Sequence, residues 1–350
     1  MKALVLEDFN RLGVHDVETP RPGPGEVLLR VVATGICGSD IHGFTGENGR
    51  RVPGQVMGHE SSGRIEALGE GVPEADLPVG HAATFNPVIV PDDAVAAYAG
   101  REQHCPGKVV VGVTQHYQAS FADYVLIPAR NVVPLHEELP VHLGALIEPL
   151  AVALHAVRRA GAAAGQKVLV VGGGPIGQST VLALRMEGVT DVVVSEVSAE
   201  RRDLCTKLGA RAIDPGAGEL PEQVEALLGA QADLAVDAVG INATANGALR
   251  STVPGGTVVL VGMGSPRIDL GAFAVSTEER ALVGSFTYSA RDFADAADWA
   301  GTHGELLAEL VSRVVAPEQA HDAFTALASG SGTPGKILVA FDEVPGAERP

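Results

Sequence analysis

The stretch "KVLVVGGGPIGQSTVLALRMEG", Lys167–Gly188, decides the fold of this chain. An apolar run is followed by G-x-G-x-x-G at Gly172, Gly174 and Gly177, and then by a segment with a helical pattern. In a dinucleotide-binding unit, such glycines form a tight turn, let the backbone approach a pyrophosphate and let the helix pack on the strand. The alternative is a tight strand-to-helix turn that binds no ligand.

Residues near this turn favour the dinucleotide interpretation. Pro175, followed by Ile176, fits the first turn of a helix, where a missing backbone donor costs nothing. Glu196 ends the next apolar run, "DVVVSE". A carboxylate there can accept hydrogen bonds from ribose hydroxyls and repel a 2′-phosphate, which favours NAD over NADP. Arg201 and Arg202 are the opposing signal, because arginines can hold a phosphate.

Short apolar runs alternate with helical patterns after Pro149, which indicates a parallel sheet and an α/β fold. The predicted strands are Lys167–Val171, Asp191–Ser195, Ala232–Ala238, Thr257–Val261 and Ala281–Phe286. Residues 1–140 instead contain short β-like runs broken by glycine and proline, which predicts a β-rich domain. From about Ser289 the chain is predicted to form helices and a last strand that returns to the first domain.

Composition narrows the classes of function. The 350 residues carry a formal charge of −18, which argues against a nucleic-acid or anionic-membrane surface. Three widely spaced cysteines, Cys37, Cys105 and Cys205, make no disulfide framework and indicate a reducing compartment. The apolar run at the N-terminus is too short for a secretory signal, and no run approaches ~18 residues. We therefore expect a cytoplasmic location.

Three distant stretches contain residue types that bind zinc. They are "GICGSDIH" with Cys37, Ser39, Asp40 and His42, "MGHESSG" with His59 and Glu60, and "LIEPLAVALHAV" with Glu148. A thiolate, an imidazole and one or two carboxylates suit a catalytic zinc site, which keeps one position open. From the residues alone, a buried cysteine, a core histidine and surface acids are an equal alternative.

The order of several motifs resolves this choice. The chain resembles the zinc-dependent medium-chain alcohol and polyol dehydrogenases, including those acting on sorbitol, butanediol and threonine. The matching stretches are "PGPGEVLLRVVATGICGSDIH", "GHESSG", "ASFADYV", "EPLAVALHAV", "VLVVGGGPIG", "GGTVVLVGM" and "GKILVAF". The resemblance implies a GroES-like β-barrel catalytic domain over 1–150, a Rossmann NAD-binding domain over 151–288, and a segment over 289–350 that rejoins the first domain.

The resemblance also implies roles for individual residues. Cys37, His59 and Glu60 would bind the catalytic zinc, and Glu148 would be a fourth ligand or an acid behind the bound water. Ser39 and His42 would form a proton relay, and Asp40 would orient His59. Cofactor contacts would come from Gly172, Gly174, Pro175, Ile176, Gly177, Glu196, Arg201, Val239, Val261, Gly262, Phe286 and Thr287.

We expect an enzyme that transfers hydride between a secondary alcohol, in a diol, polyol or cyclitol, and NAD. Reduction of a ketone in an amino-polyol or cyclitol biosynthetic pathway is the first alternative. A zinc-free quinone-type reductase and a non-catalytic NAD-binding protein are the others. The expected partners are a small alcohol or ketone and further copies of the chain, as a homodimer or homotetramer.

Two of the places where the chain departs from the family bear on metal content and substrate. Many relatives hold a structural zinc with C-x2-C-x2-C-x7-C, but counting back from Cys105 places Pro91, Ala94 and Ala97 at the other positions. One thiolate does not make a closed tetrahedral site, so we expect one catalytic zinc and no structural zinc. Thr287 stands where sorbitol dehydrogenases usually have arginine, which weakens the case for sorbitol itself.

Overall fold

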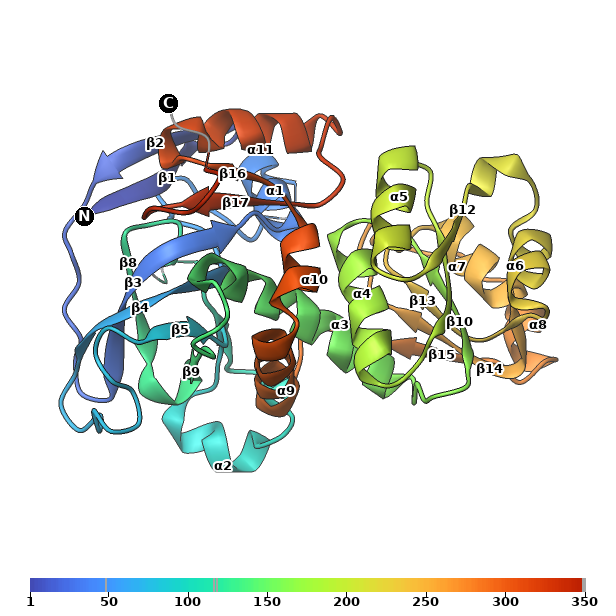
Figure 1. Ribbon diagram of the computed structural model, residues 1–350, viewed down its shortest axis with the longest axis horizontal. Coiled ribbons are helices and arrows are strands. Elements are labelled where there is room, and N and C mark those ends of the chain that lie inside the picture. The colour runs from blue at the N-terminus through green and yellow to red at the C-terminus, as the bar shows by residue number, and fades with distance from the viewer. Residues whose placement is uncertain (48, 116, 118, 348–350) are drawn as a thin grey trace. The chain divides into compact units, whose positions relative to one another are not determined.

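The computed structural model describes residues 1–47, 49–115, 117 and 119–347. The chain divides into two compact units (Figure 1). Unit 1 comprises Met1–Glu148 together with Ser289–Pro350, and unit 2 comprises Pro149–Tyr288. Unit 2 is therefore one continuous segment inserted into the sequence of unit 1.

Unit 2 is built on a six-stranded parallel sheet with the order β12-β11-β10-β13-β14-β15. Its strands are β10 (Lys167–Val171), β11 (Asp191–Ser195), β12 (Arg211–Ile213), β13 (Ala232–Asp237), β14 (Thr252–Leu260) and β15 (Ala281–Gly284). Counted along the chain this order is 3-2-1-4-5-6, the arrangement of a Rossmann fold. The order reverses between β10 and β13, and ligands bind at such a switch point.

The helices of unit 2 follow from the same alternation of patterns. They are α3 (Ile147–Arg159, which begins in unit 1), α4 (Pro175–Met186), α5 (Ala199–Lys207), α6 (Leu220–Leu228), α7 (Asn242–Arg250) and α8 (Ala272–Ser276), with the short 3-10 turn η5 (Pro215–Ala217). Ser198 caps α5 by accepting a hydrogen bond from the backbone of Arg201. Gly209 follows α5 with φ 104°, a conformation that favours glycine and ends the helix.

Unit 1 contains a seven-stranded sheet with the order β16-β17-β3-β4-β5-β9, in which β8 also pairs with β3. The strands are β3 (Glu26–Gly35), β4 (Glu60–Leu68), β5 (Ala82–Phe85), β8 (Tyr124–Pro128), β9 (Val132–Pro134), β16 (Val311–Val315) and β17 (Lys336–Ala340). Two small antiparallel pairs complete it: β1 (Lys2–Asp8) with β2 (Arg11–Asp16), and β6 (Val88–Ile89) with β7 (Val109–Val110). The β17–β3 pairing ties the C-terminal segment to the N-terminal strands.

Most helices of unit 1 are short, and α9, with 13 residues, is the longest of those described. They are α1 (Gly38–Thr45), α2 (Val95–Tyr98), α9 (Ala290–Thr302), α10 (Gly304–Glu309) and α11 (Ala320–Ala328). The 3-10 turns are η1 (Asp92–Ala94), η2 (Glu102–His104), η3 (Ala129–Asn131), η4 (Val141–Leu146) and η6 (Pro317–Gln319). One core cluster joins α1 and α11 through Phe44 and Phe324, whose ring centroids are 5.5 Å apart. The C-terminal helix thus helps to fix α1.

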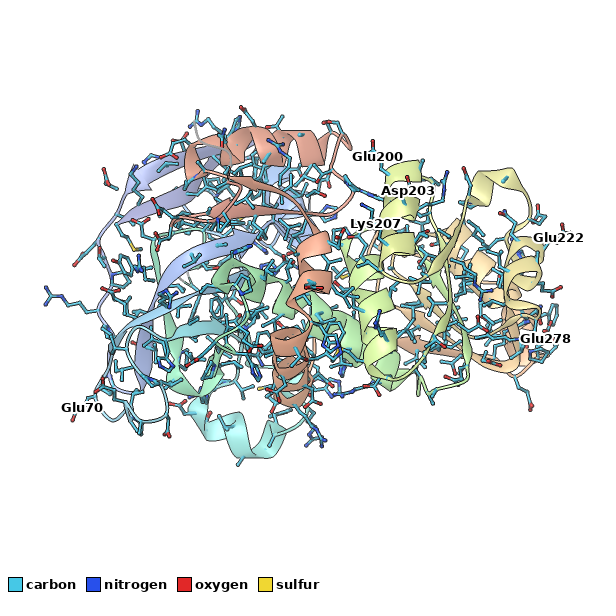
Figure 2. All side chains as sticks on the ribbon, in the orientation of Figure 1. Glu70, Glu200, Asp203, Lys207, Glu222 and Glu278 are labelled. Carbon is cyan, nitrogen blue, oxygen red and sulfur yellow. The ribbon has the colours of Figure 1, made fainter. Side chains whose placement is uncertain are left out.

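The predicted strands of unit 2 are confirmed, with differences at their ends. The strand predicted over Thr257–Val261 begins earlier, at Thr252, and the strand predicted over Ala281–Phe286 ends at Gly284. The short strand β12 has only three residues and carries too little pattern to be predicted. Acidic side chains such as Glu200 and Asp203 project from α5 (Figure 2) and contribute to the charge of −18.

One helical stretch among the described residues, Val141–Arg159, is long and apolar enough to cross a membrane by length and composition alone. Of its most apolar window, 78% is buried inside the protein. Such burial is what a core helix of a folded domain shows. The stretch therefore adds no argument for a membrane span.

Candidate metal centre and dinucleotide edge

Cys37 lies where β3 passes into α1. It is the N-cap residue of α1, and its backbone N–H donates to Asp40 Oδ2 at 3.2 Å. This local bond fixes the direction in which the chain leaves the strand. The Cys37 side chain is only partly buried, so a metal ion or a reagent can reach its sulfur.

His59 and Glu60 come from the start of β4, the neighbour of β3. Gly35 on β3 pairs with Glu60 on β4. A Cβ atom on Gly35 would lie only 2.4 Å from Glu60 Oε2, so a glycine is needed to leave room for the carboxylate. The register of two strands thus brings the "GHE" stretch next to the end of β3, where Cys37 follows.

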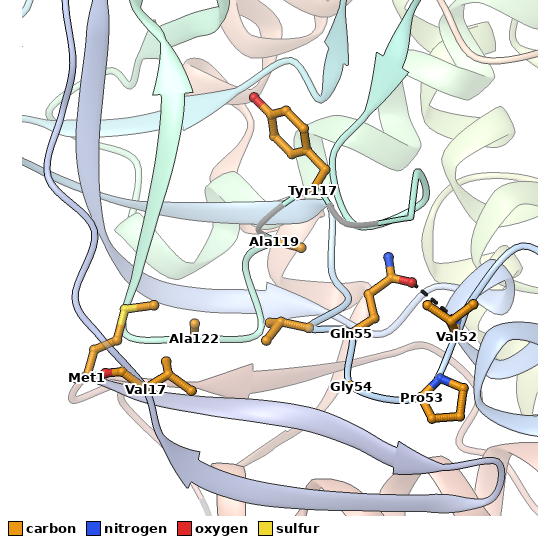
Figure 3. Close-up of a pocket in the computed structure, with 10 residues that line it drawn as sticks. Met1, Val17, Val52, Pro53, Gly54, Gln55, Tyr117, Ala119 and Ala122 are labelled. Carbon is orange, nitrogen blue, oxygen red and sulfur yellow. Dashed lines mark hydrogen bonds between the residues drawn. The ribbon is translucent and has the colours of Figure 1, made fainter.

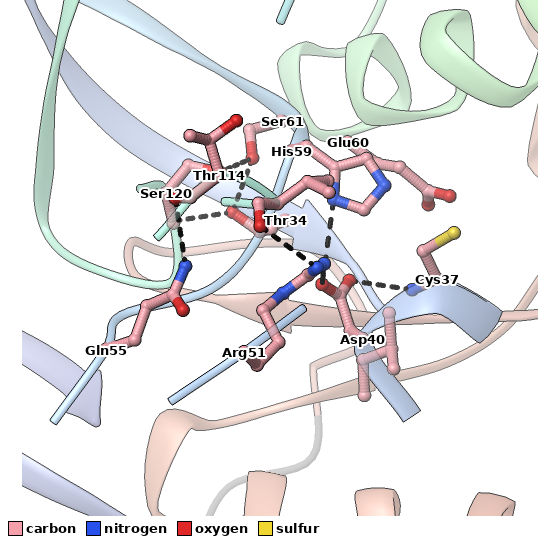
Figure 4. A network of polar contacts seen from close by, with 12 residues as sticks. Thr34, Cys37, Asp40, Arg51, Gln55, His59, Glu60, Ser61, Thr114 and Ser120 are labelled. Atoms are coloured by element: carbon pink, nitrogen blue, oxygen red, sulfur yellow. Dashed lines mark hydrogen bonds and ion pairs between the residues drawn. The ribbon is translucent and has the colours of Figure 1, made fainter. Parts of the chain in front are cut away.

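Cys37, His59 and Glu60 each offer one ligand atom, and these atoms lie within 4.8 Å of one another (Figure 4). A sulfur, a ring nitrogen and a carboxylate oxygen at this spacing suit Zn²⁺ with an open position. Burial favours the neutral imidazole, but Asp40 and Cys37 outweigh it and raise the pKa of His59 to about 10. The negative charges that hold this proton would also attract a metal cation, which must displace the proton to bind the ring, so the donor set fits zinc.

A buried lysine, Lys336, lies beside the same set. Its Nζ is 2.8 Å from Glu60 Oε1 and 2.7 Å from Oε2. Burial lowers the pKa of Lys336, but the charges of Glu60, Cys37 and Glu148 outweigh this effect and raise it above the usual value. Glu148, near the start of α3, is buried and acts electrostatically on both His59 and Lys336, but it is outside the compact donor set.

The predicted relay residues both lie on α1, three positions apart. Ser39 Oγ is buried and has no hydrogen-bond partner within the described part of the chain. His42 is half exposed, and its Nδ1 lies 3.0 Å from Glu47 Oε2. The Ser39 hydroxyl is therefore free to bind a ligand, and the His42 imidazole is open to water.

In unit 2, the residues predicted to contact the cofactor follow the carboxyl ends of parallel strands, except Arg201, which lies in α5. The glycine turn follows β10, Glu196 follows β11, Val239 follows β13, and Val261 with Gly262 follows β14. Phe286 and Thr287 come after β15, and Thr287 has φ 50°, a strained value for a β-branched residue. Carboxyl ends of parallel strands share one edge of the sheet, so these residues lie on the edge where dinucleotides bind.

The glycine turn is as tight as the pattern predicts. Gly172 has φ 98°, and a Cβ atom on Gly177 would lie 1.8 Å from the Gly172 carbonyl oxygen. Gly174 is the N-cap of α4, with Pro175 at the first helical position. The backbone donors at the start of this twelve-residue helix suit a pyrophosphate.

Glu196 is buried beside this turn. Its Oε2 accepts the Gly173 backbone N–H at 2.7 Å, and its Oε1 accepts that of Ser198 at 2.8 Å. Two backbone donors fix the carboxylate at the end of β11, where a ribose-binding acid belongs.

The two arginines behave differently. Arg201 points toward the glycine turn, since its Nη1 is 4.0 Å from a Cβ position built on Gly174. Arg202 Nη1 donates to the carbonyls of Glu196 and Val197, each at 2.8 Å, and lies 3.3 Å from Asp214 Oδ2. Arg202 is therefore held by the protein itself.

Sequence reasoning missed three residues at these sites: Arg51, Lys336 and Asp237. Asp237 ends β13 and accepts the backbone N–H groups of Val239 and Gly240 at 2.9 and 3.0 Å. A carboxylate at a strand end is a signal that could have found it. Lys336 and Arg51 carry no such signal, because a lysine opening a strand and an arginine in "GRRVP" are typical of exposed positions.

A separate pocket of about 320 Å³ lies in unit 1 (Figure 3). Its lining includes Met1, Val17, Pro53, Tyr117 and Ala122, and none of the candidate ligands. Its walls are mostly apolar and carry no convergent charged groups, so nothing connects it to the chemistry of the donor set.

Comparison with known proteins identifies the family. Residues 23–137 match the family described as "Alcohol dehydrogenase GroES-like domain", and residues 175–302 match "Zinc-binding dehydrogenase". The chain is 33% identical to L-galactonate-5-dehydrogenase of Escherichia coli K12, over 84% of this chain and 85% of that protein. It is 34% identical to sorbitol dehydrogenase of Ovis aries, over 82% of both.

A protein of Sinorhizobium meliloti 1021, solved bound to NADP, has a TM-score of 0.87 and 32% identity, and the match covers 97% of this chain and 98% of that one. Both units are thus matched, and the relatives exceed 30% identity over more than four fifths of the chain. This protein therefore belongs to the zinc-dependent medium-chain alcohol and polyol dehydrogenase family and is an oxidoreductase.

Proposed function

We propose that the protein oxidises a secondary alcohol group of a diol, polyol or cyclitol with NAD as the hydride acceptor. The observation that supports this most directly is the compact donor set of Cys37, His59 and Glu60. Two residues after Cys37, the buried Ser39 hydroxyl has no hydrogen-bond partner in the described chain. The relatives named for L-galactonate and sorbitol support a polyhydroxylated substrate. Thr287, in place of the usual arginine, argues against sorbitol itself.

In this proposal Cys37, His59 and Glu60 would hold the zinc, which when bound would supply Lewis acidity toward an alcohol oxygen. Ser39 Oγ accepts the hydroxyl proton, since it is buried and uses no other partner in the described chain. His42 receives that proton and releases it to water, because its ring is half exposed. Glu47, at 3.0 Å, fixes the orientation of the His42 ring.

Glu148 is proposed to be a nearby acid rather than a permanent zinc ligand. One thiolate and one carboxylate already neutralise the two charges of a zinc ion. A second carboxylate ligand would make the site net negative and weaken its Lewis acidity. Glu148 is also outside the compact set formed by the other three donors.

Unit 2 is proposed to bind NAD through the glycine turn, Glu196 and Arg201. Unit 1 is proposed to hold a single catalytic zinc, because the lobe that carries a structural zinc in relatives has Pro91, Ala94 and Ala97 at three ligand positions. We propose a cytoplasmic location. We also propose a homodimer or homotetramer, with the edge strand β15 and its exposed Leu282 as a candidate contact surface.

The reductive direction, on a ketone of an amino-polyol or cyclitol pathway, uses the same groups in reverse. It is therefore a second candidate for the physiological reaction. A zinc-free quinone-type reductase is not favoured, because the donor set is compact and complete.

Metal analysis combined with a dehydrogenase screen tests the proposal. The purified enzyme should carry about one zinc per chain and should turn over at least one diol, polyol or cyclitol with NAD. His59→Ala should lose both zinc and activity. His42→Ala should keep its zinc but turn over ~10²-fold more slowly. Two tightly held zincs, or full activity of a metal-free enzyme, would contradict the proposal.

A further inference from the structure

Arg51 is one of the most completely buried side chains of unit 1. Its side chain has 0% exposure, although arginine is almost never fully buried without a partner. Its Nη2 lies 3.4 Å from Asp40 Oδ1, and its Nη1 donates to the Val113 carbonyl at 3.3 Å. Asp40, also at 0% exposure, is its ion-pair partner.

Asp40 in turn contacts two of the three candidate ligands (Figure 4). Its Oδ2 accepts the backbone N–H of Cys37 at 3.2 Å. Its Oδ1, the oxygen that faces Arg51, lies 3.6 Å from His59 Nδ1. A single carboxylate thus links the backbone of the thiolate ligand, the ring of the imidazole ligand and the buried guanidinium.

The protein is shaped around the stem of Arg51. A Cβ atom on Gly43, in α1, would lie 2.4 Å from Arg51 Cγ and 3.2 Å from Met57 Sδ. The absence of a side chain at Gly43 is therefore what allows the arginine to pass under the helix. The guanidinium is then held from two sides, by Asp40 and by the Val113 carbonyl.

The charges around the site explain why a cation is needed there. Asp40, Glu60 and Glu148 are buried acids, and Arg51 and Lys336 are the buried cations among the described residues of the cluster. With Cys37 as a thiolate and His59 neutral, the states in which both bind a metal, the cluster has two more negative than positive charges. A divalent ion neutralises that excess. Without Arg51, the buried Asp40 carboxylate would keep only His59 and the Cys37 backbone N–H as partners and would lose the guanidinium that Oδ1 faces.

We propose that Arg51 is a positioning residue for the metal centre. Its guanidinium fixes the Asp40 carboxylate, which holds Cys37 and His59 in the geometry that binds zinc. This inference rests on the proposed function, since it concerns the same donor set. Residues that orient metal ligands typically contribute 10–100-fold to metal affinity or activity.

A double-mutant cycle on zinc affinity tests the proposal. The zinc dissociation constant of the purified, metal-stripped protein is measured by competition with a chromophoric chelator. The variants are Arg51→Met, Asp40→Asn and the double variant. We expect Arg51→Met alone to raise the dissociation constant ~10–100-fold. In the Asp40→Asn background, Arg51→Met should change the zinc dissociation constant less than ~3-fold, because Arg51 acts through Asp40.

Cobalt supplies a readout that does not depend on activity. The visible spectrum of the Co²⁺-substituted protein reports the ligand geometry, and Arg51→Met should shift its bands. A matched control is Arg280→Met in unit 2. Arg280 is also buried and binds the Thr252 carbonyl at 2.6 and 2.8 Å, but it lies outside the metal centre. Its loss should lower stability and leave zinc affinity and the cobalt spectrum unchanged.

Arg51→Lys keeps the charge but loses the planar guanidinium that contacts Asp40 and the Val113 carbonyl through different nitrogens. This variant is measured instead if Arg51→Met does not fold. It should weaken zinc binding by at least ~3-fold and shift the cobalt bands. Wild-type zinc affinity and spectrum in a folded Arg51 variant would overturn the inference, and so would an equal loss in the Asp40→Asn background. A failure of the proposed function gives a different result from a failure of this inference. If the donor set does not bind zinc at all, wild type and His59→Ala should bind zinc equally weakly.

Discussion

The three cysteines differ in how far a reagent can reach them. Cys37 is partly exposed, whereas Cys105 and Cys205 are buried. Burial, and next the charge of Glu196, raise the pKa of Cys205 to about 12. At pH 8 only about one part in 10⁴ of such a thiol is the reactive thiolate. We therefore predict that Cys37 is the one reactive thiol of the metal-free chain.

We therefore expect iodoacetamide to alkylate Cys37 in the metal-stripped protein and to leave Cys105 and Cys205 unmodified. Added zinc should protect Cys37, because a coordinated thiolate does not react freely. Peptide mass spectrometry after labelling measures all three sites at once. Labelling of Cys37 at the same rate with and without zinc would remove it from the ligand set.

Cofactor choice depends on Glu196 and on the two arginines after it. Glu196 is fixed by two backbone donors, and Arg202 is held by Asp214 and two carbonyls. The buried carboxylate is fixed and repels a 2′-phosphate, whereas Arg201 is partly exposed and screened by salt, and Arg202 is already engaged by the protein. We expect at least ~10-fold higher kcat/KM with NAD than with NADP, equivalent to ~1.4 kcal/mol.

Substitutions at Glu196 check this assignment by steady-state kinetics. Glu196→Ala should reduce the preference for NAD, and Glu196→Arg should reduce it further. Arg202→Ala is the matched control, and it should leave the ratio near that of wild type. A wild-type enzyme that uses NADP at least as efficiently would show that Glu196 does not bind the ribose.

At the scale of elements, the question is which contacts hold the lobe, defined here as residues 91–105, against the rest of unit 1. Its turns η1, α2 and η2 are short and mostly exposed. Glu102 connects it to α9, because its Oε2 accepts the Ala290 backbone N–H at 3.0 Å while its Oε1 accepts that of Gly100 at 2.9 Å. A carboxylate at a helix N-terminus contributes about 0.3–1 kcal/mol.

Glu102→Ala should therefore open the lobe more often, and we expect two- to five-fold faster tryptic cleavage near Arg101. Glu102→Gln keeps an acceptor for Ala290 and should fall between the alanine variant and wild type. Zinc content should not change in either variant. Cleavage at the wild-type rate in Glu102→Ala would mean that other contacts hold the lobe.

Across these elements, the sequence predicted the parts whose signals are local. The strand–glycine–helix unit at Lys167–Gly188 and the stretches containing Cys37 and His59 each carry a pattern within a few residues. Arg51 and Lys336 were missed, because only the fold shows that they are buried. Lys336 is 276 residues from Glu60 and reaches it through the pairing of β17 and β4 with the same strand, β3.

At the scale of the whole molecule, the two ligands are assigned to different units. The candidate zinc ligands belong to unit 1, and the glycine turn with Glu196 belongs to unit 2. A ligand that binds only the folded state stabilises it by about 2.7 kcal/mol at a hundred times its dissociation constant. Each ligand should stabilise the elements that hold it.

Hydrogen exchange followed by mass spectrometry measures this for each segment. Zinc added to the metal-stripped protein should slow exchange in α1 and at the start of β4, where Cys37, His59 and Glu60 are held. NADH added without zinc should instead slow exchange in the turn from Gly172 to Gly177 and in the first turn of α4. His59→Ala should abolish the effect of zinc and leave that of NADH. If zinc alone protected the glycine turn as strongly as NADH does, the assignment of one ligand to each unit would be wrong.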